Sequence, residues 1–479
     1  MSISRRAVMA SALAASVVGR GRARAAGDET PVTILQLQKR SIEVNGKSAS
    51  VYGIRQPDGA AGLTTSVGKN FRVRVENQID APSLIHWHGM APPWQQDGVP
   101  GISGPPIPAG GSADYDFPLR FGGTFWMHSH QGLQEQLLMS APLIIHDDRD
   151  EPGQQEIVMM LHDFSFTPPE EIYAALRKPK AMAGMGGMPG MGGGSSSGMA
   201  MPAKSGGAAA PDLNDVTYDA FLANDRTLAD PDVVKVEAGG RVLLRVINGS
   251  AMSNFHLDLG ALDGELIAVD GFRVNPVTAR RFPIAVAQRL DIRLALPRSP
   301  AAYPVLAVLE GSAKQTGIVL AASGGAVTRI PDLAAQPSPA LDLALERSLR
   351  ATTPLAARKP DRTHTLDLTG DMANYVWSIN NVVWTKDTPP LPIANGERVE
   401  LVLVNKTGMP HPMHLHGHQF QVVEIDGQRF AGAVRDTVLV PPRTRVVVAF
   451  DADNPGWWAF HCHLLYHLEA GMFTTFRYV

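Results

Sequence analysis

The sequence is poor in cysteine, aromatic residues and charge. It has a single cysteine, Cys462, so no disulfide can form within the chain, which excludes a disulfide-stapled scaffold. Aromatic residues make up 6% and charged residues 19% of the 479 positions, and no segment of the mature chain is apolar enough to cross a membrane. A soluble chain of this length needs more than one hydrophobic core, so we expect about three domains.

Proline and glycine are abundant instead, with 37 and 46 residues, which favours many short strands and turns over long helices. One strand-like pattern recurs three times, at residues 71–77, 241–248 and 398–405. Each copy is hydrophobic, ends in asparagine and follows a turn that contains glycine. Three copies in one chain predict an all-β protein built from three homologous β-sandwich domains.

These repeats and the composition between them suggest a division of the chain. We expect a leader at 1–26, a first domain at 27–150, a second at 151–325, a linker at 326–362 and a third domain at 363–479. The linker is rich in proline and alanine. Residues 180–210 are rich in glycine and serine and form an insertion in the second domain, where a stable helix or strand is not expected.

The N-terminus has the composition of an export signal. Arg5 and Arg6 precede a weakly apolar stretch that is too short to span a bilayer, and small residues follow at Ala25 and Ala26. The arginine pair resembles a twin-arginine signal, so we expect a periplasmic or secreted protein. Removal of residues 1–25 takes away five arginines and no acid, which moves the formal charge from −3 to −8. An acidic mature chain argues against a nucleic-acid partner.

Histidine is concentrated in four short segments, at residues 86–88, 128–130, 411–418 and 461–467. Residues i and i+2 of a strand point to the same side, so each His-x-His pair presents two imidazoles on one face. Four such pairs therefore offer eight imidazoles for metal binding: His86, His88, His128, His130, His414, His416, His461 and His463. Imidazole suits copper, zinc, iron and nickel, so these residues alone do not identify the metal.

Cys462 narrows the choice of metal. Strand alternation places its thiolate on the face opposite His461 and His463, where it can bind a different metal from theirs. His467 and His411 complete a set of two histidines and one cysteine, and Met472 is available as a weak axial ligand. This set is typical of a blue-copper electron-transfer site. Zinc would favour a closed tetrahedral site and would gain nothing from the backbone connection to a histidine cluster.

The four segments, in this order, resemble the copper motifs of the multicopper oxidase family, which includes laccases, cuprous oxidases and ferroxidases. The resemblance covers nearly the whole mature chain. It implies three cupredoxin-like Greek-key domains and four copper ions. It also implies one-electron oxidation of a small reducing substrate coupled to reduction of O₂ to water. We expect a monomer without membrane insertion. By this resemblance, the type 1 copper would be held by His411, Cys462, His467 and Met472, the type 2 copper by His86 and His414, and the type 3 pair by His88, His128, His130, His416, His461 and His463.

Two acids are candidates for catalytic roles. Asp97 matches the position of an acid that relays protons in related bacterial enzymes, although an Asp-Gly turn would also explain it. Those relatives often carry a second acid directly after the type 1 histidine, where this chain has Leu468. Glu469 could replace that acid or could face the substrate beside His467.

The insertion is the main indication of the substrate. It contains six methionines within 20 residues, 182–201, and thioethers suit Cu(I), although a linker with incidental methionines is the alternative. We therefore expect oxidation of Cu(I), of phenols at an exposed type 1 histidine, or of both. The competing hypothesis is a copper-sequestering protein with secondary oxidase activity. Ordinary structural roles are expected for the other five histidines: His146, His162, His256, His364 and His418.

Overall fold

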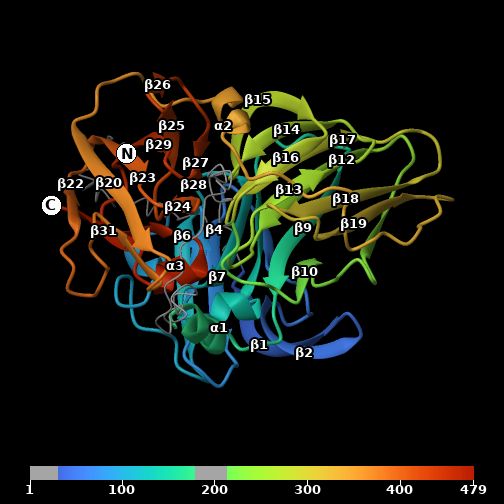
Figure 1. The fold of residues 1–479 in the computed structure, drawn as a ribbon, viewed down its shortest axis with the longest axis horizontal. Coiled ribbons are helices and arrows are strands. Elements are labelled where there is room, and N and C mark those ends of the chain that lie inside the picture. Colours follow the sequence, from blue (N-terminus) through green and yellow to red (C-terminus); the bar gives the residue numbers. More distant parts are fainter. Residues whose placement is uncertain (1–30, 179–212) are drawn as a thin grey trace, which may run out of the picture.

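The computed structural model describes residues 31–178 and 213–479. The described part is almost entirely β-structure, arranged as three two-sheet sandwiches in chain order (Figure 1). Strands from blue to cyan form the first sandwich, green to yellow the second, and orange to red the third (Figure 1). The prediction of an all-β protein with three cupredoxin-like Greek-key sandwiches is confirmed. None of the helices in the described residues has the length and apolarity needed to span a membrane.

The first sandwich pairs two four-stranded sheets. In spatial order, one sheet contains β2 (Lys47–Arg55), β1 (Thr33–Val44), β4 (Asn70–Asn77) and β6 (Ser112–Pro118). The other contains β3 (Leu63–Ser66), β8 (Ser140–His146), β7 (Gly123–Ser129) and β5 (Ile85–His88). Two short 3₁₀ helices lie in its loops, η1 (Trp94–Gln96) and η2 (Gln134–Leu137).

The second sandwich has a six-stranded and a five-stranded sheet. The larger contains β10 (Ala220–Ala223), β9 (Gln155–Phe164), β12 (Arg241–Asn248), β17 (Arg289–Ala295), β14 (Gly264–Val269) and β15 (Phe272–Ala279). The smaller contains β11 (Asp232–Val236), β19 (Gln315–Ala322), β18 (Ala302–Leu309), β13 (Phe255–Asp258) and β16 (Arg281–Ile284). Helix α1 (Pro169–Leu176) follows β9, and α2 (Ala344–Ser348) lies on the connection to the third sandwich.

The third sandwich has a seven-stranded and a five-stranded sheet. The larger contains β21 (Val376–Ile379), β20 (Arg362–Asp371), β23 (Arg398–Asn405), β29 (Arg445–Asp451), β25 (Phe420–Ile425) and β26 (Gln428–Arg429), and β27 (Val434–Arg435) pairs with β25. The smaller contains β22 (Leu391–Ile393), β31 (Phe473–Tyr478), β30 (Trp457–Cys462), β24 (His411–Leu415) and β28 (Thr437–Val440). Helix α3 (Leu465–Glu469) follows β30.

The three repeated sequence patterns are strands β4, β12 and β23, which occupy equivalent places in the three sandwiches. Each pairs in parallel with the first strand of its sandwich, β1, β9 or β20. The final asparagines, Asn77, Asn248 and Asn405, are buried and donate from Nδ2 to backbone carbonyls of neighbouring loops, at 2.9, 2.9 and 2.7 Å for the shortest bonds. Each asparagine therefore satisfies loop backbone that would otherwise be buried without a partner.

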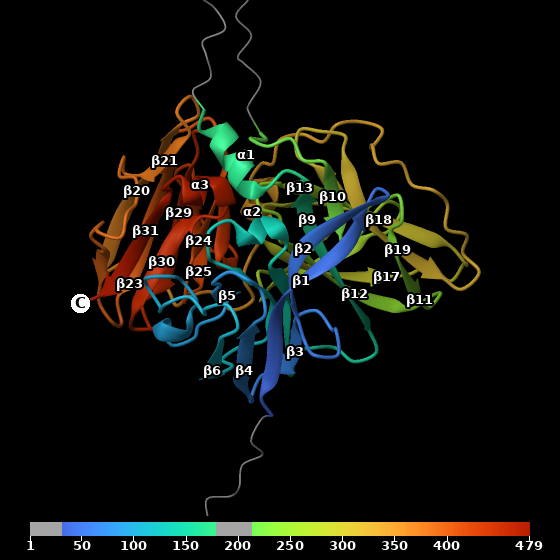
Figure 2. The same ribbon diagram turned by 90° about the horizontal axis from the view of Figure 1, so that it is seen from below.

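The sandwiches pack closely against one another. Buried hydrophobic side chains of the second and third sandwiches form one continuous cluster, and most of those of the first form a separate one. Figure 2 shows the first sandwich below the junction of the other two, with β5 close to the strands of the third. This contact between the first and third sandwiches is where the histidine segments meet.

Candidate metal centre

Strand β30 of the third sandwich places Cys462 and His461 on opposite faces. Its neighbour β24 runs antiparallel, with Met413 opposite Cys462 and His414 opposite His461. Residues that are directly opposite in an antiparallel pair share a face. Cys462 therefore lies on the side of Met413 and His411, whereas His461 and His414 share the other side. The alternation that was inferred from the sequence holds across both strands.

On the first of these faces, Cys462 lies against two histidines. Its Sγ is 3.6 Å from His411 Nδ1 and 3.8 Å from His467 Nδ1, and these two nitrogens are 3.2 Å apart. Met472 is buried beside them, and its backbone N–H donates to the His467 carbonyl at 3.0 Å while its carbonyl accepts from Cys462 N–H at 3.1 Å. Three soft or borderline ligand atoms thus meet in a space from which water is excluded.

On the opposite face, the eight paired imidazoles converge. His86 and His88 come from β5, His128 from β7 and His130 from the residue after it, so four rings belong to the first sandwich. The third sandwich supplies the other four, from β24, β30 and the residues that follow: His414, His416, His461 and His463. All are buried except His130, which is partly exposed.

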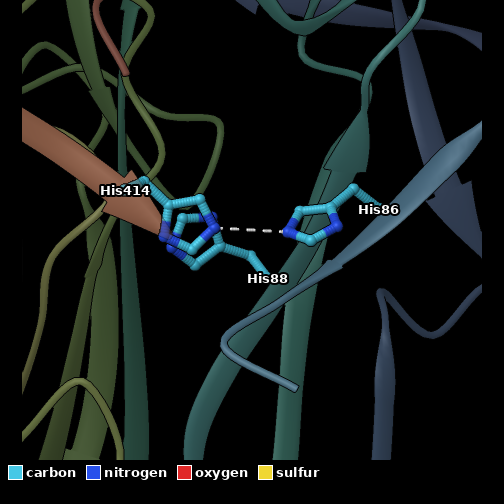
Figure 3. Close-up of side chains that lie close together, drawn as sticks. All are labelled: His86, His88 and His414. Atoms are coloured by element: carbon cyan, nitrogen blue, oxygen red, sulfur yellow. Dashed lines mark hydrogen bonds between the residues drawn. The ribbon is translucent and has the colours of Figure 1, made fainter. Parts of the chain in front are cut away.

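Figure 3 shows how the two sandwiches meet at three of these rings. His86 Nε2 lies 3.4 Å from His414 Nε2 across the junction. His88 stacks on His414, with ring centroids 3.7 Å apart and an interplanar angle of 15°. The imidazoles of β5 and β24 therefore face a common space rather than their own sandwich cores.

The other five rings form two triads together with His88. In the first, the ligand atoms of His88, His128 and His463 all lie within 4.8 Å of one another. In the second, composed of His130, His416 and His461, the Nε2 atom of His461 lies 3.3 Å from that of His130 and 3.0 Å from that of His416. Nitrogen lone pairs that meet head-on in this way repel unless a proton or a cation lies between them.

The outward nitrogens of these rings have partners that set the tautomer. His86 Nδ1–H donates to the Asp97 carbonyl at 2.8 Å, His414 Nδ1–H to the Asp436 carbonyl at 2.9 Å, and His461 Nδ1–H to the Cys462 carbonyl at 2.9 Å. A proton on Nδ1 leaves the Nε2 lone pair free to point inward, as in metal-bound histidines.

Several inward nitrogens are buried without a hydrogen-bond partner among the described residues: His88 Nδ1, His128 Nε2 and His463 Nε2. Burial of polar atoms without partners is costly, and a metal ion would satisfy all of them.

Burial also sets the protonation states that metal binding requires. Desolvation, together with repulsion from neighbouring rings, lowers the pKa well below its ordinary value in seven histidines: His88, His128, His130, His411, His416, His461 and His463. Neutral imidazole is the form that binds metals. Burial raises the pKa of the Cys462 thiol, so its thiolate needs a cation beside it. The donor set therefore fits copper at both places.

Three buried carboxylates surround the eight imidazoles. Asp97 Oδ2 accepts from His416 Nδ1 at 2.8 Å, and its Oδ1 lies 3.3 Å from His86 Nδ1. Asp436 accepts from His88 Nε2 at 3.0 Å and pairs with Arg289 of β17. The third carboxylate, Glu135 of η2, lies 2.9 Å from His128 Nδ1. Negative charge around the pocket complements a group of bound cations.

Comparisons with known proteins identify the family. Three family profiles described as multicopper oxidase match residues 36–150, 156–323 and 357–479. The chain belongs to the multicopper oxidase family. It is 31% identical to multicopper oxidase MmcO of Mycobacterium tuberculosis (strain ATCC 25618 / H37Rv), over 98% of this chain and 91% of the relative.

This multicopper oxidase is also similar in sequence to proteins named for copper resistance and in fold to a solved multicopper oxidase. A copper resistance protein A homolog of Pseudomonas syringae pv. tomato (strain ATCC BAA-871 / DC3000) is 28% identical, over 94% of this chain and 92% of the relative. Among solved structures, Fet3p, a multicopper oxidase that functions in iron import, superposes with a TM-score of 0.78 at 20% identity, covering 94% of this chain and 90% of Fet3p.

One expectation about this multicopper oxidase is wrong. His467 is fully buried rather than exposed. Its Nε2 lies 2.9 Å from Asp215 Oδ2, which also accepts from the Tyr375 hydroxyl at 2.6 Å, and Trp377 stacks on its ring with centroids 3.9 Å apart. Asp215 comes from the segment before β10, so packing of the second sandwich covers a histidine of the third.

The remaining predicted residues supply no ligand atom to the imidazole pocket, although His418 Nδ1 lies 3.2 Å from the His416 carbonyl. Glu469 is exposed at the end of α3; partial desolvation raises its pKa, and Arg177 beyond α1 opposes that shift. The five histidines expected to be structural bind other partners: His146 contacts Glu156, His162 Ser140, His256 the Pro339 carbonyl, His364 the Pro392 carbonyl, and His418 Tyr478. The leader and the methionine-rich insertion lie outside the described residues.

Sequence reasoning missed the carboxylates Glu135, Asp436 and Asp215. None stands at a recognisable spacing from a histidine motif. Asp436 directly precedes Thr437, which pairs with His414 between β28 and β24, so a correct strand register would have found it. Glu135 and Asp215 lie outside the strands, and nothing in the local sequence indicates their positions.

Proposed function

We propose that this multicopper oxidase takes electrons one at a time from a small reducing substrate and uses four of them to reduce O₂ to water. Copper, when bound, supplies the one-electron chemistry at the Cys462 group and the storage of electrons at the imidazole pocket. His411, Cys462, His467 and Met472 would hold the type 1 ion, and His86 and His414 the type 2 ion. Each triad would hold one ion of the type 3 pair, which makes four per chain.

The observation that carries this proposal is the segment 461–463. Cys462 faces one group of ligands, while its two neighbours each belong to a different triad in the pocket behind it. The two centres are therefore joined covalently through a few backbone bonds. A protein that only stored copper would have no need of this connection, and a zinc site would gain nothing from it.

We assign proton handling near the pocket to Asp97. It is buried and contacts one histidine of the type 2 set and one of a triad, His86 and His416. The same residue also makes the tight turn expected of an Asp-Gly pair, because Gly98 has a φ of +87° and a side chain there would collide with the Ile85 carbonyl. Glu469 is too exposed to share this environment, and we propose for it a role towards the substrate.

The test is the stoichiometry of oxygen consumption by the copper-loaded enzyme with Cu(I) or a phenol. We expect four electrons per O₂ and no hydrogen peroxide. Cys462→Ser should abolish both the intense blue absorption and O₂ consumption. The control is His364→Gln in the same sandwich, whose side chain lies outside both ligand groups and which should leave both signals unchanged. A Cys462→Ser enzyme that consumes O₂ at the wild-type rate would contradict the proposal.

For the reducing substrate we propose Cu(I), with phenols as further donors. The methionines of the insertion and the relatives named copper resistance protein A support copper, and those named laccase support phenols. Deletion of residues 182–201 should lower Cu(I) turnover and keep or raise phenol turnover. If copper binding collapses while O₂ consumption is untouched, the competing function, copper sequestration, is favoured instead.

We further propose that the protein acts outside the cytoplasm as a monomer and is exported by the twin-arginine route. The arginine pair at Arg5 and Arg6 supports this route. Replacement of both by lysine should retain the protein in the cytoplasm, as measured by cell fractionation.

A further inference from the structure

Glu135 is a buried carboxylate that the sequence did not connect with the metal centre. It lies in η2 (Gln134–Leu137), a single helical turn that ends at Leu138 in the left-handed conformation, with φ +61°. This turn directs the Glu135 side chain inward, where only 3% of the residue is exposed. A buried acid is expensive unless it is paired or hydrogen-bonded, so its partners indicate its role.

The partners are two histidines of one triad. Glu135 Oε2 lies 2.9 Å from His128 Nδ1, and Oε1 lies 3.8 Å from His463 Nδ1. Among the described residues, no lysine or arginine forms an ion pair with this carboxylate. Oε2 is therefore within hydrogen-bonding distance of His128 in the first sandwich, whose Nδ1 also lies 3.2 Å from the Ser129 carbonyl. Oε1 faces His463 of the third sandwich at a longer, purely electrostatic distance and has no hydrogen-bond partner among the described residues.

The same two histidines have Nε2 atoms that are buried without a partner in the described part of the chain. Their rings lie 5.0 Å apart, and each approaches His88, at 5.6 Å from His128 and 5.0 Å from His463. A carboxylate that accepts the Nδ1 proton fixes the tautomer and leaves the Nε2 lone pair free. The acid and the open nitrogens thus lie on opposite sides of the same rings.

From this geometry we propose that Glu135 is a positioning residue for the triad of His88, His128 and His463. It holds His128 by a hydrogen bond with Nε2 towards the bound metal and favours the same orientation of His463 through the charge of its second oxygen. The proposal rests on the function proposed above, because it assumes copper in this triad. Asp97 occupies a comparable place on the other triad, where its Oδ2 accepts from His416 Nδ1 at 2.8 Å. Glu135 would then lie behind His128 and His463 as Asp97 lies behind His416, and both carboxylates come from loops of the first sandwich. Asp436 of the third sandwich accepts from the remaining ring of the Glu135 triad, His88.

Two substitutions separate hydrogen bonding from packing. Glu135→Leu removes the acceptor and fills a similar volume. Glu135→Gln keeps an oxygen that can accept from His128 but turns an amide N–H₂ towards His463. The control is Gln136→Leu on the same helical turn, which is equally buried but bonds Asp163 and Tyr218 rather than a histidine.

The readouts are copper content after dialysis against graded chelator concentrations and the spin count in electron paramagnetic resonance, which detects cupric ions that are not magnetically paired. Loss of a hydrogen-bond partner behind a metal ligand weakens metal affinity about 10–100-fold. We expect Glu135→Leu to lose copper from this triad at chelator concentrations lower by that factor. The copper ion left in the other triad would no longer be magnetically paired and should become visible as added spin. The blue absorption of the Cys462 group should stay. Glu135→Gln should fall between Glu135→Leu and the wild type, and Gln136→Leu should match the wild type.

The proposal is overturned if Glu135→Leu folds and retains its copper and spin count as the wild type does, or if Gln136→Leu loses copper equally. Should Glu135→Leu not fold, Glu135→Gln decides the matter, since wild-type affinity in that variant is incompatible with the assigned role. A wild-type protein that binds no copper in this triad or shows no blue absorption would instead refute the proposed function.

Discussion

Arg289 and Asp436 form a fully buried ion pair where the three sandwiches meet. Arg289 Nη1 lies 2.8 Å from Asp436 Oδ1, and the same carboxylate accepts from His88 Nε2 at 3.0 Å. Arg289 also donates to the Thr124 and Asp270 carbonyls, at 3.1 and 3.0 Å. Burial alone would raise the pKa of Asp436, but attraction to Arg289 outweighs it, and the net pKa lies below the ordinary value.

Arg289→Leu should therefore be strongly destabilising, because it leaves Asp436 buried without its cation. Removal of one partner of a buried ion pair costs about 3–5 kcal/mol. For a unit of 150–250 residues this corresponds to a fall in melting temperature of roughly 6–20 °C. Differential scanning calorimetry of the copper-loaded protein measures the shift, and copper content measures whether His88 keeps its ligand position.

The matched control is Arg293→Leu, the same substitution four residues along β17. Arg293 pairs with Glu151 and Glu265 at the surface, where such pairs contribute about 0–1 kcal/mol. Its melting temperature should stay within a few degrees of the wild type. If Arg289→Leu melts no lower than Arg293→Leu, the ion pair does not support the junction and the reasoning is refuted.

Two further predictions concern buried polar groups. Burial lowers the pKa of His162 to about 4 from an ordinary 6.5. The neutral ring therefore contributes fully to the stability of the folded protein above pH 6.5, and this contribution is lost as the pH falls towards 4. The loss in the free energy of unfolding is about 3 kcal/mol. His162→Gln can keep a bond to Ser140 and should flatten the pH dependence of stability in that window; an unchanged slope in chemical denaturation would contradict this. Asp97→Asn should slow reoxidation by O₂ about 10²-fold or more while reduction of the blue centre by substrate is unchanged, as stopped-flow absorbance can show; equal slowing of both steps would argue against a role in proton handling.

Much of the fold could be predicted because it depends on local rules. The three repeated strands were visible as hydrophobic runs that end in asparagine, and the structure shows why that residue recurs: Asn77, Asn248 and Asn405 each satisfy loop carbonyls. The spacing of the histidines and Cys462 could be interpreted through strand alternation, which β24 and β30 follow. The proposed domain boundaries and copper assignments stay predictions.

The features that the sequence did not reveal all depend on packing between distant segments. Glu135 faces His463, and Asp436 reaches His88, only because the first and third sandwiches dock. The burial of His467 likewise depends on Asp215 and on Tyr375, which belong to different sandwiches. Periodicity along one strand carries no information about such contacts.

The central claim is that one backbone segment serves two separate copper centres. Anomalous X-ray scattering at the copper absorption edge, measured on crystals of the copper-loaded protein, tests it most directly. The account predicts one peak between Cys462, His411 and His467 and three more within the pocket of eight imidazoles. A structure in which Cys462 binds no copper, or in which the pocket holds a single ion, would contradict it.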